Sequence, residues 1–493
     1  MRKLVTAVLL LPLCALAQKS GNPTKFASTI TPECLKKQLY IIASPEMEGR
    51  ETATPGQKRA ATYIESQFKE IGLQPGNNGS YQFYYNVYQD SLISADLQVN
   101  GQSFTLDKDF NPTGNYLNAT IRIGEVVVIG SNAIDTVNKA NLAGKFVLFT
   151  SNVMMGGRNA NSIDRALMNK GIAGVFMVSN LYPRSKPANR KGFQTINAYP
   201  RTIAPQQFTI SEAVARAIVG KDYDNVKGNN NAFQAYPAEI VTAVNKVTTI
   251  AQSSNVIGLL PGTDLKDQYL FITAHYDHLG KRDSVIYYGA DDDGSGTTTV
   301  IELARAFAKA KAAGNGPRRT IVFMTVSGEE KGLWGSEYYA NHPVFPLEKT
   351  TADLNIDMIG RLDTERKTAD SLNYIYVVGD DKLSSDLKPI SEAVNTKYTK
   401  LNLDYKFNDV NDPNRIYYRS DHYNFAKNGV PIIFYYDGML KADYHKPTDT
   451  PDKINYPLMA KRAQLIFYTA WDMANRNDML KRDIPLDKNV FNR

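Results

Sequence analysis

Runs of apolar residues that stop at acidic or histidine-bearing segments mark the middle of the chain. Three such runs lie at 269–274, 320–326 and 352–356. They are followed by His275-Tyr276-Asp277-His278, by Ser327-Gly328-Glu329-Glu330 and by Asp357. Continuous apolar runs of this length are typical of strands buried on both faces. Because the carboxyl ends of strands line the ligand crevice of an open α/β sheet, we expect these polar segments to meet at one edge.

Helical and strand patterns alternate around this stretch. Apolar residues at three- and four-residue spacing predict helices at 32–43, 56–71, 384–395, 421–428 and 456–475, and a further helix after Gly289. Shorter apolar runs predict strands at 374–378, 405–407 and 431–436. The alternation predicts a layered α/β core.

A group of short strand patterns interrupts the α/β pattern of the main domain. Strand candidates at 124–130, 144–149 and 173–178, with a helical pattern at 161–171, require a core of their own, and the main pattern resumes at 255–260. We therefore expect a small β-rich α/β domain inserted at 96–237. The main domain would then consist of 18–95 and 238–478, followed by a tail at 479–493.

The first seventeen residues have the three parts of a secretory signal. Arg2-Lys3 precedes an apolar run that ends in Ala15-Leu16-Ala17, which predicts cleavage before Gln18 and export. The run is too short to span a bilayer. Cys14 raises the alternative of a lipoprotein signal, but Leu13 is bulkier than such signals usually allow. Cleavage would leave Cys34 as the remaining cysteine, which excludes an internal disulfide.

Composition narrows the range of partners. The chain has 493 residues, of which 43% are hydrophobic and 22% charged, as in ordinary globular proteins. Its formal charge of +7 is small for this length, and the basic residues are scattered. Neither a nucleic-acid-binding surface nor a membrane-binding surface is therefore expected.

The residue types at the strand ends point to a metal centre. His275 and His445 occur beside acidic residues and turns, and Asp292, Glu330 and Asp357 lie at the same predicted edge. Imidazole and carboxylate groups are the ligands that zinc takes in catalytic sites. Five ligands are too many for one ion but suit two ions about 3.5 to 4 Å apart that share a carboxylate. We expect Asp292 to bridge, with His275 and Asp357 on one Zn²⁺, and Glu330 and His445 on the other.

Three neighbouring residues suit supporting or catalytic roles. Asp277 is expected to hold the far ring nitrogen of His275. Adjacent residues in a tight turn point in different directions, so Glu329 can face bound water while Glu330 binds metal; Glu329 is the expected general base. Tyr444 is a candidate donor to an oxyanion, and a packing role for it is equally compatible with the sequence.

Two other motifs suggest different chemistry. Ser420-Asp421-His422 has the residue types of a hydrolase triad, but neighbours in sequence rarely converge in space, so a helix start is preferred. Asp291-Asp292-Asp293-Gly294 lacks the spaced acids of a calcium loop. Asp291 and Asp293 are expected to shape the turn that presents Asp292.

These motifs together resemble one family. The segments around His275, Asp292, Glu329-Glu330, Asp357 and His445 occur in the same order as in the co-catalytic zinc aminopeptidases of the M28 peptidase family. The resemblance covers about 250–455 and extends to the opening helices through Glu48-Gly49-Arg50. It implies a layered α/β/α core with a mixed, mostly parallel sheet, two zinc ions per chain, and peptide substrates with a free N-terminus.

The inserted segment resembles the protease-associated (PA) domain found in some of these enzymes. The resemblance rests on the strand at 126–129, on Gly144-Lys145 and on Gly171-Ile172-Ala173-Gly174-Val175. The substrate pocket is expected from loops around 361–370 and 405–418. Two alternatives stay open: a glutaminyl-cyclase-like transferase with one zinc, and a binding protein that kept the fold and lost catalysis.

Overall fold

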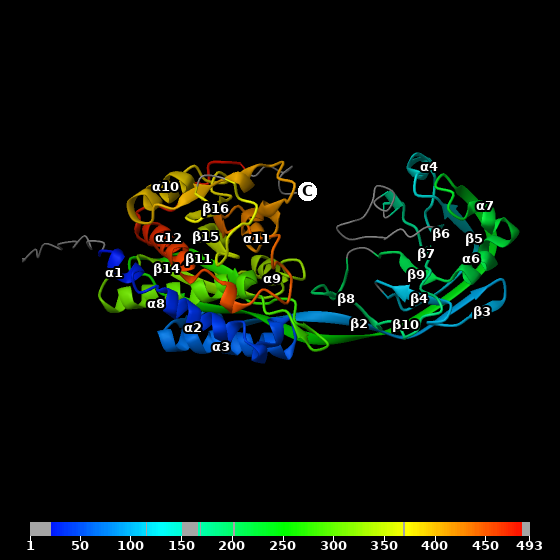
Figure 1. Cartoon of the computed structure of the whole chain (residues 1–493), viewed down its shortest axis with the longest axis horizontal. Helices are drawn as coiled ribbons and strands as arrows, with labels where there is room; N and C mark the ends of the chain where they lie inside the picture. Colours follow the sequence, from blue (N-terminus) through cyan, green and yellow to red (C-terminus); the bar gives the residue numbers. More distant parts are fainter. Residues whose placement is uncertain are drawn as a thin grey trace, which may run out of the picture. The chain divides into compact units, whose positions relative to one another are not determined.

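The computed structural model describes residues 21–114, 116–149, 166–167, 169–200, 203–367 and 370–485. The expected signal at 1–17 lies outside the described residues. The chain forms two compact units, one made of 1–85 and 253–493 and the other of 86–252 (Figure 1). Two long strands, β2 (Gln82–Val99) and β10 (Phe233–Leu260), run from one unit into the other.

The larger unit is built on a mixed sheet. Its strands, in spatial order, are β17 (Asn402–Asp404), β16 (Tyr374–Val378), β18 (Ile432–Tyr436), β15 (Thr350–Ile356), β11 (Leu265–His275), β14 (Arg319–Val326) and the end of β10. β18, β15, β11 and β14 are parallel to one another, whereas β16 and β10 pair with their neighbours β18 and β14 in the antiparallel sense. The expected layered, mostly parallel α/β core is confirmed.

One expected strand is wrong. Residues 405–407 were predicted as a strand because Tyr405 and Phe407 alternate with Lys406, but the strand is Asn402–Asp404, and Lys406–Asn408 form a short 3-10 helix. The Asp404 carboxylate accepts a hydrogen bond from the main-chain nitrogen of Lys406 at 2.9 Å. This local bond turns the chain away from the sheet.

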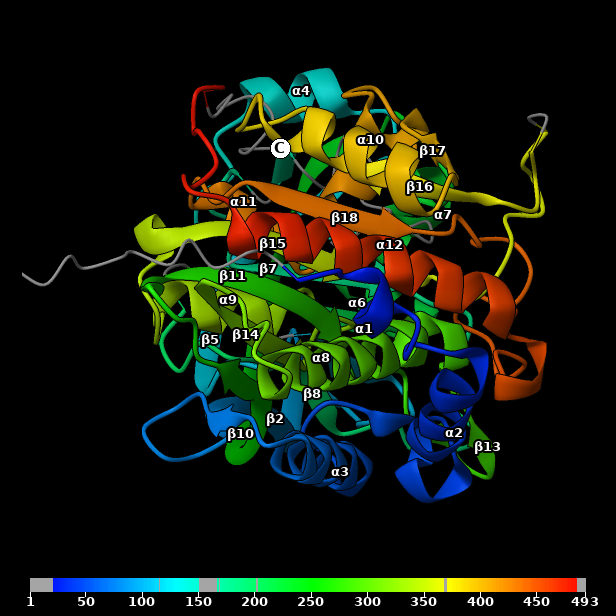
Figure 2. The ribbon, with the colours of Figure 1, turned by 90° about the vertical axis from the view of Figure 1, so that its left-hand side faces the viewer.

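Helices cover both faces of the sheet. α8 (Gly296–Ala312) and α12 (Tyr456–Asn475) lie across one face, with α2 (Pro32–Ile42) and α3 (Pro55–Ile71) beside α8 (Figure 2). α9 (Trp334–Asn341) and α11 (His422–Lys427) pack on the other face. α10 (Leu387–Tyr398) packs against α12.

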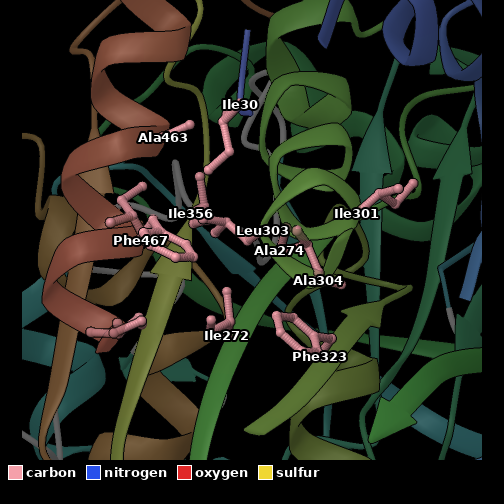
Figure 3. Close-up of a cluster of buried hydrophobic side chains, with 14 of the residues drawn as sticks. Ile30, Ile272, Ala274, Ile301, Leu303, Ala304, Phe323, Ile356, Ala463 and Phe467 are labelled. Atoms are coloured by element: carbon pink, nitrogen blue, oxygen red, sulfur yellow. The ribbon is translucent and has the colours of Figure 1, made fainter. Parts of the chain in front are cut away.

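The central strands bury both faces, as their continuous apolar runs require. In β11, Ile272 and Ala274 pack under α8 and α12, together with Phe323 and Phe467 (Figure 3), while Phe271 packs on the opposite side. Alternate side chains of a strand point to opposite faces. A strand between two helical layers therefore needs apolar residues at every position.

The smaller unit has its own sheet and core. Its strands, in spatial order, are β10, β5 (Ala119–Ile129), β6 (Phe146–Phe149), β7 (Gly174–Val178), β9 (Gln206–Ile210) and β4 (Phe110–Thr113). Buried residues form clusters on both sides of this sheet, one of them including α6 (Glu212–Val219). The helix expected at 161–171 lies largely outside the described residues. The bounds 96–237 and the PA-like identity stay predictions.

Candidate metal centre

The order and register of three parallel strands bring the polar segments together. β11 lies between β14 and β15, and His275 pairs in register with Val326, the last residue of β14. On the other side Thr273 pairs with Asn355, so Asp357 lies level with His275. Each strand stops at this edge, and the segments that follow carry the expected ligands.

Asp292 lies between two imidazole rings. His275 Nε2 is 3.2 Å from Asp292 Oδ1 and 3.6 Å from Asp357 Oδ1. On the other side, His445 Nε2 is 3.1 Å from Asp292 Oδ2 and 3.1 Å from Glu330 Oε2. All five residues expected to bind metal therefore meet, and the two oxygens of Asp292 face different histidines.

The loop that presents Asp292 is held by its acidic neighbours. The carboxylate of Asp293 accepts hydrogen bonds from the main-chain nitrogens of His275 and Met358, at 3.1 Å each. Asp291 Oδ1 accepts from the main-chain nitrogen of Gly360 at 2.8 Å. Both side chains thus tie the loop to neighbouring strand ends, and Asp292 is left to face the imidazoles.

Asp277 contacts the ring of His275 and the main chain of Glu329 without being one of the expected metal ligands. His275 Nδ1 lies 3.0 Å from the main-chain oxygen of Asp277 and 3.8 Å from its carboxylate, so the main-chain oxygen is the nearer partner of the ring. The carboxylate instead accepts hydrogen bonds from Thr52 Oγ1 at 2.6 Å and from the main-chain nitrogen of Glu329 at 3.2 Å. Asp277 therefore helps to fix the segment that carries Glu329 and Glu330.

Arg50 ties the N-terminal helices to the loops of the site. Its guanidinium is fully buried and donates to the main-chain oxygens of Ile42, Tyr276, Tyr288 and Gly289 at 2.7–2.9 Å. A planar fork with five donors suits four carbonyl groups at fixed positions. The signal for this role was present in Glu48-Gly49-Arg50, which sequence reasoning assigned only to the family resemblance.

Charges in the site perturb one another strongly. Burial alone would lower the pKa of His445, but the adjacent carboxylates of Asp292 and Glu330 raise it to about 10. Burial raises the pKa of Glu329 well above its usual range, and the charge of Glu330 acts in the same direction. The carboxylates thus favour the positively charged form of the His445 imidazole. A divalent cation would replace this proton.

The donor atoms fit a metal centre. His275 Nε2, Asp292 Oδ2, Glu330 Oε1 and both ring nitrogens of His278 are buried without a hydrogen-bond partner among the described residues. Two groups of ligand atoms lie within 4.8 Å of one another: His275, Asp292 and Asp357 form one, and His278, Asp292 and Glu330 form the other. Buried polar atoms normally have partners, so this convergence indicates ion binding.

His278 was missed as a site residue by sequence reasoning. It follows Asp277 in the segment after β11, and its side chain is fully buried beside Glu330. The available signal was a second histidine in a segment already assigned to the metal edge. Asp449 was missed as well, although it lies in the same segment as His445, four residues further on.

Ser420 and His422, which belong to the triad-like motif Ser420-Asp421-His422, have separate hydrogen-bond partners. Ser420 Oγ accepts a hydrogen bond from Asn355 Nδ2 at 2.9 Å. His422 Nε2 lies 2.8 Å from the main-chain oxygen of Tyr417, at the start of α11. The three neighbouring side chains therefore do not assemble a nucleophile and base.

A pocket opens beside the metal-ligand cluster. Its walls include Glu329 and Asp357, the apolar side chains of Ile416, Phe434 and Leu440, and the polar side chains of Arg419 and Tyr444. Of the two loops expected to form this pocket, 405–418 contributes through Ile416, and no described residue of 361–370 lies in its wall. Phe434 belongs to strand β18, and Leu440 and Tyr444 belong to the segment that leads to His445.

Comparison with known proteins agrees with this geometry. Residues 255–470 match the model of peptidase family M28. A probable leucine aminopeptidase of Trichophyton verrucosum is 27% identical over 316 residues, which cover 58% of this chain and 83% of that protein. A probable zinc metalloprotease of Pyrenophora tritici-repentis is 29% identical over 229 residues, which cover 44% of this chain and 47% of that protein.

Solved structures share the fold. An aminopeptidase from Aneurinibacillus sp. strain AM-1 is similar with a TM-score of 0.57 and 20% identity, over 94% of this chain and 99% of that one. A zinc aminopeptidase from Bacillus subtilis is similar with a TM-score of 0.52 and 17% identity, over 92% of this chain and 99% of that one. Residues 255–470, which carry the metal-ligand cluster, therefore form a domain of peptidase family M28, and the resemblance seen in its motifs is confirmed.

Proposed function

We propose that this protein is a two-zinc aminopeptidase that removes residues from the free N-terminus of peptides. The observation that carries the proposal is the position of Asp292, whose two oxygens lie 3.2 Å and 3.1 Å from the imidazoles of His275 and His445. A carboxylate placed in this way is the expected bridge of a two-metal site. The relatives named as leucine aminopeptidase and zinc metalloprotease support both the activity and the metal.

Two sets of residues would hold the ions. His275 and Asp357 would bind one Zn²⁺, Glu330 and His445 the other, and Asp292 both. Bound zinc supplies Lewis acidity, which lowers the pKa of water toward about 7 and polarises a peptide carbonyl.

Glu329 is the proposed general base. It lines the pocket beside Asp292 and Asp357, and its main chain is held by the Asp277 carboxylate. It would accept a proton from the attacking water and deliver that proton to the leaving amine. Burial raises the pKa of Glu329, which suits a carboxylate that must hold a proton between the two transfers.

Tyr444 is placed to assist as a donor. Its hydroxyl accepts a hydrogen bond from Arg419 Nη2 at 2.9 Å, and its ring stacks on His445 with centroids 3.8 Å apart. Burial raises the pKa of this phenol, so the hydroxyl keeps its proton and can donate it to the oxyanion of the tetrahedral intermediate.

The pocket favours a particular kind of N-terminal residue. Ile416, Phe434 and Leu440 present apolar surface, whereas Glu329 and Asp357 present carboxylates. The carboxylates would attract a free α-ammonium group, and the apolar walls would bury an aliphatic or aromatic side chain. We infer a preference for peptides that begin with such residues.

Mass spectrometry of the products tests the proposal. The zinc-loaded protein is incubated with a peptide that begins with leucine and with the same peptide carrying an N-acetyl group. We expect stepwise loss of residues from the free peptide alone. Cleavage of both peptides, or internal cleavage, would contradict an aminopeptidase.

The two alternatives have distinct outcomes in the same assay. A peptide that begins with glutamine would lose ammonia if the protein were a glutaminyl-cyclase-like transferase, and it would lose a residue if the protein were an aminopeptidase. Ligand atoms on both sides of Asp292 favour the second outcome over a single-zinc enzyme. A binding protein would leave every peptide intact while metal is bound.

Export and the role of the smaller unit are also proposals. The sequence of 1–17 supports a cleaved signal, and the mass of the protein from its native host would show whether it begins at Gln18. Among the described residues, no helix is both long enough and apolar enough to cross a membrane. We propose that residues 96–237 are a PA-like domain that guides substrate, which a deletion variant would test through the KM for long and short peptides.

A further inference from the structure

His278 occupies a fixed, buried position next to the proposed metal centre. Its main-chain nitrogen donates to the main-chain oxygen of Arg50 at 3.3 Å, and a bridge links it to Glu51. Its side chain is fully buried. A Cβ atom at Gly289 would lie only 2.5 Å from His278 Cγ, so a glycine at that position is needed for the ring to fit.

The ring nitrogen that faces the site approaches two carboxylates. His278 Nδ1 lies 2.9 Å from Glu330 Oε1 and 3.8 Å from Asp292 Oδ2. None of these three atoms makes a hydrogen bond within the described part of the chain. Buried polar atoms that are left without a partner destabilise the folded state. Three such atoms that converge on one point indicate a shared ligand.

The spacing is comparable with that of the other half of the site. Four tetrahedral ligands with bonds of 2.0–2.2 Å lie about 3.3–3.6 Å apart. The His275 group shows separations of 3.2 and 3.6 Å, and the His278 group shows 2.9 and 3.8 Å. The separations of the His275 group lie close to this range, and those of the His278 group lie on either side of it.

We propose that His278 binds, through Nδ1, the metal ion held between Asp292 and Glu330. The inference rests on the proposed two-metal function and extends its ligand set by one residue. This ion would then have four protein residues, His278, His445, Asp292 and Glu330, which close a tetrahedral site.

The consequence is an asymmetric centre. The ion beside His275 would have three protein residues and an open position, as catalytic zinc sites have. The ion beside His278 would be the tighter of the two. The centre should therefore load in two separable steps.

Metal titration of the full-length protein tests the assignment. The wild type and His278→Ala are stripped of metal and titrated with Co²⁺, while visible absorption reports ligand type and number. Zinc content is measured after equilibration with a competing chelator. His342→Ala is the matched control, because His342 is an exposed histidine on the same unit.

We expect two ions of unequal affinity in the wild type and in His342→Ala. In His278→Ala, the affinity for the tighter ion should fall by more than the roughly 10- to 100-fold that loss of a supporting hydrogen bond costs, and its cobalt bands should change. Unchanged affinities and an unchanged spectrum would overturn the proposal.

A second variant separates ligation from hydrogen bonding. His278→Asn keeps an N–H donor near the position of Nδ1 but removes the imidazole. If His278 only supports Glu330 by a hydrogen bond, His278→Asn should recover the wild-type affinity, which would overturn the proposal. If it binds metal, His278→Asn should behave as His278→Ala does. Circular dichroism of each metal-free variant checks that it has folded.

A failure of the His278 assignment can be distinguished from a failure of the proposed aminopeptidase function. Peptide cleavage is assayed separately on the same samples. A wild type that binds two ions without releasing N-terminal residues would refute the aminopeptidase and leave the assignment of His278 supported. A wild type that binds fewer than two ions would overturn the assignment.

Discussion

The carboxylate of Asp449 accepts a hydrogen bond from the main-chain nitrogen of Asp292 at 3.2 Å. It also accepts from the main-chain nitrogen of Asp291, at 3.0 Å. Asp449 is fully buried and lies four residues after His445. A single segment therefore supplies one proposed ligand and holds the loop of the proposed bridging ligand.

Replacing Asp449 should loosen the metal centre. In Asp449→Ala the two main-chain nitrogens lose their acceptor, and Asp292 loses its fixed position. We expect the affinity for zinc to fall about 10- to 100-fold, as is usual when a supporting partner of a metal ligand is removed. Competition with a chelator measures this. Asp452→Ala, at an exposed position three residues further on, should bind zinc as the wild type does; an equal loss in both variants would contradict the role.

Replacing Glu329 should separate catalysis from metal binding. In Glu329→Gln the side chain keeps its size but cannot accept a proton, so kcat should fall by about 10²- to 10⁴-fold while the zinc content stays unchanged. Peptide assays and metal analysis on the same samples test this. Glu348→Gln, at an exposed position, is the control. Full activity of Glu329→Gln would refute Glu329 as the base.

The fold and the meeting of the five expected ligands at one edge were predictable because their signals are local. β11, β14 and β15 contain apolar runs, and a segment with expected ligands follows each run directly. Parallel strands in one sheet then place His275 and Asp357 at the same edge. The register of the strands confirms this juxtaposition.

The roles of His278, Asp449 and Phe434 were missed because they depend on contacts between segments that are distant in the sequence. The approach of His278 to Glu330 depends on how the chain turns after two different strands, and the bonds of Asp449 join loops more than 150 residues apart. The pocket wall at Phe434 belongs to β18, which sequence reasoning treated only as core. Periodicity contains no information on such contacts, because it reports which face a residue occupies rather than what it meets there.

Replacing Arg50 should destabilise the larger unit and its site together. Lysine cannot donate to four carbonyl groups, so Arg50→Lys leaves buried carbonyl oxygens without partners. We expect a loss of about 3 kcal/mol or more in the free energy of unfolding, because hydrogen bonds to charged groups contribute about 1.5–3 kcal/mol each. Urea denaturation measures this, and Arg59→Lys, whose side chain is 44% exposed, is the control. Equal stability of the two variants would contradict the role of Arg50.

Removing metal should lower thermal stability as well as activity. Without cations, the carboxylates of Asp292, Glu330 and Asp357 lie close together and repel one another, which the imidazoles of His275 and His445 relieve in part. Binding to the folded state stabilises by about 2.7 kcal/mol per site at 100 times Kd. We expect a chelator to lower Tm and zinc to restore both Tm and peptide hydrolysis, whereas Mg²⁺, which prefers oxygen ligands, should restore neither. An unchanged Tm after complete removal of zinc would contradict a bound metal centre.

His422 should make the fold sensitive to mild acid. Burial lowers the pKa of this ring to about 3, although its hydrogen bond to the main-chain oxygen of Tyr417 opposes the shift. In the unfolded chain a histidine has a pKa near 6.5. Between these two values the unfolded state binds a proton that the folded state does not, so stability falls as pH decreases from about 6.5 toward 3, by up to about 1.4 kcal/mol per pH unit.

A variant of His422 separates its effect on the pH dependence of stability from the effect of the titrating carboxylates. His422→Phe preserves an aromatic ring against Phe434, on which His422 stacks with centroids 4.7 Å apart, and removes the titrating group. We expect denaturant unfolding between pH 5 and 7 to show a smaller loss of stability with acid for His422→Phe than for the wild type. His342→Phe, at an exposed position, should keep the wild-type slope. The same slope in His422→Phe and the wild type would show that His422 is protonated in the folded protein, in conflict with its burial against Phe434.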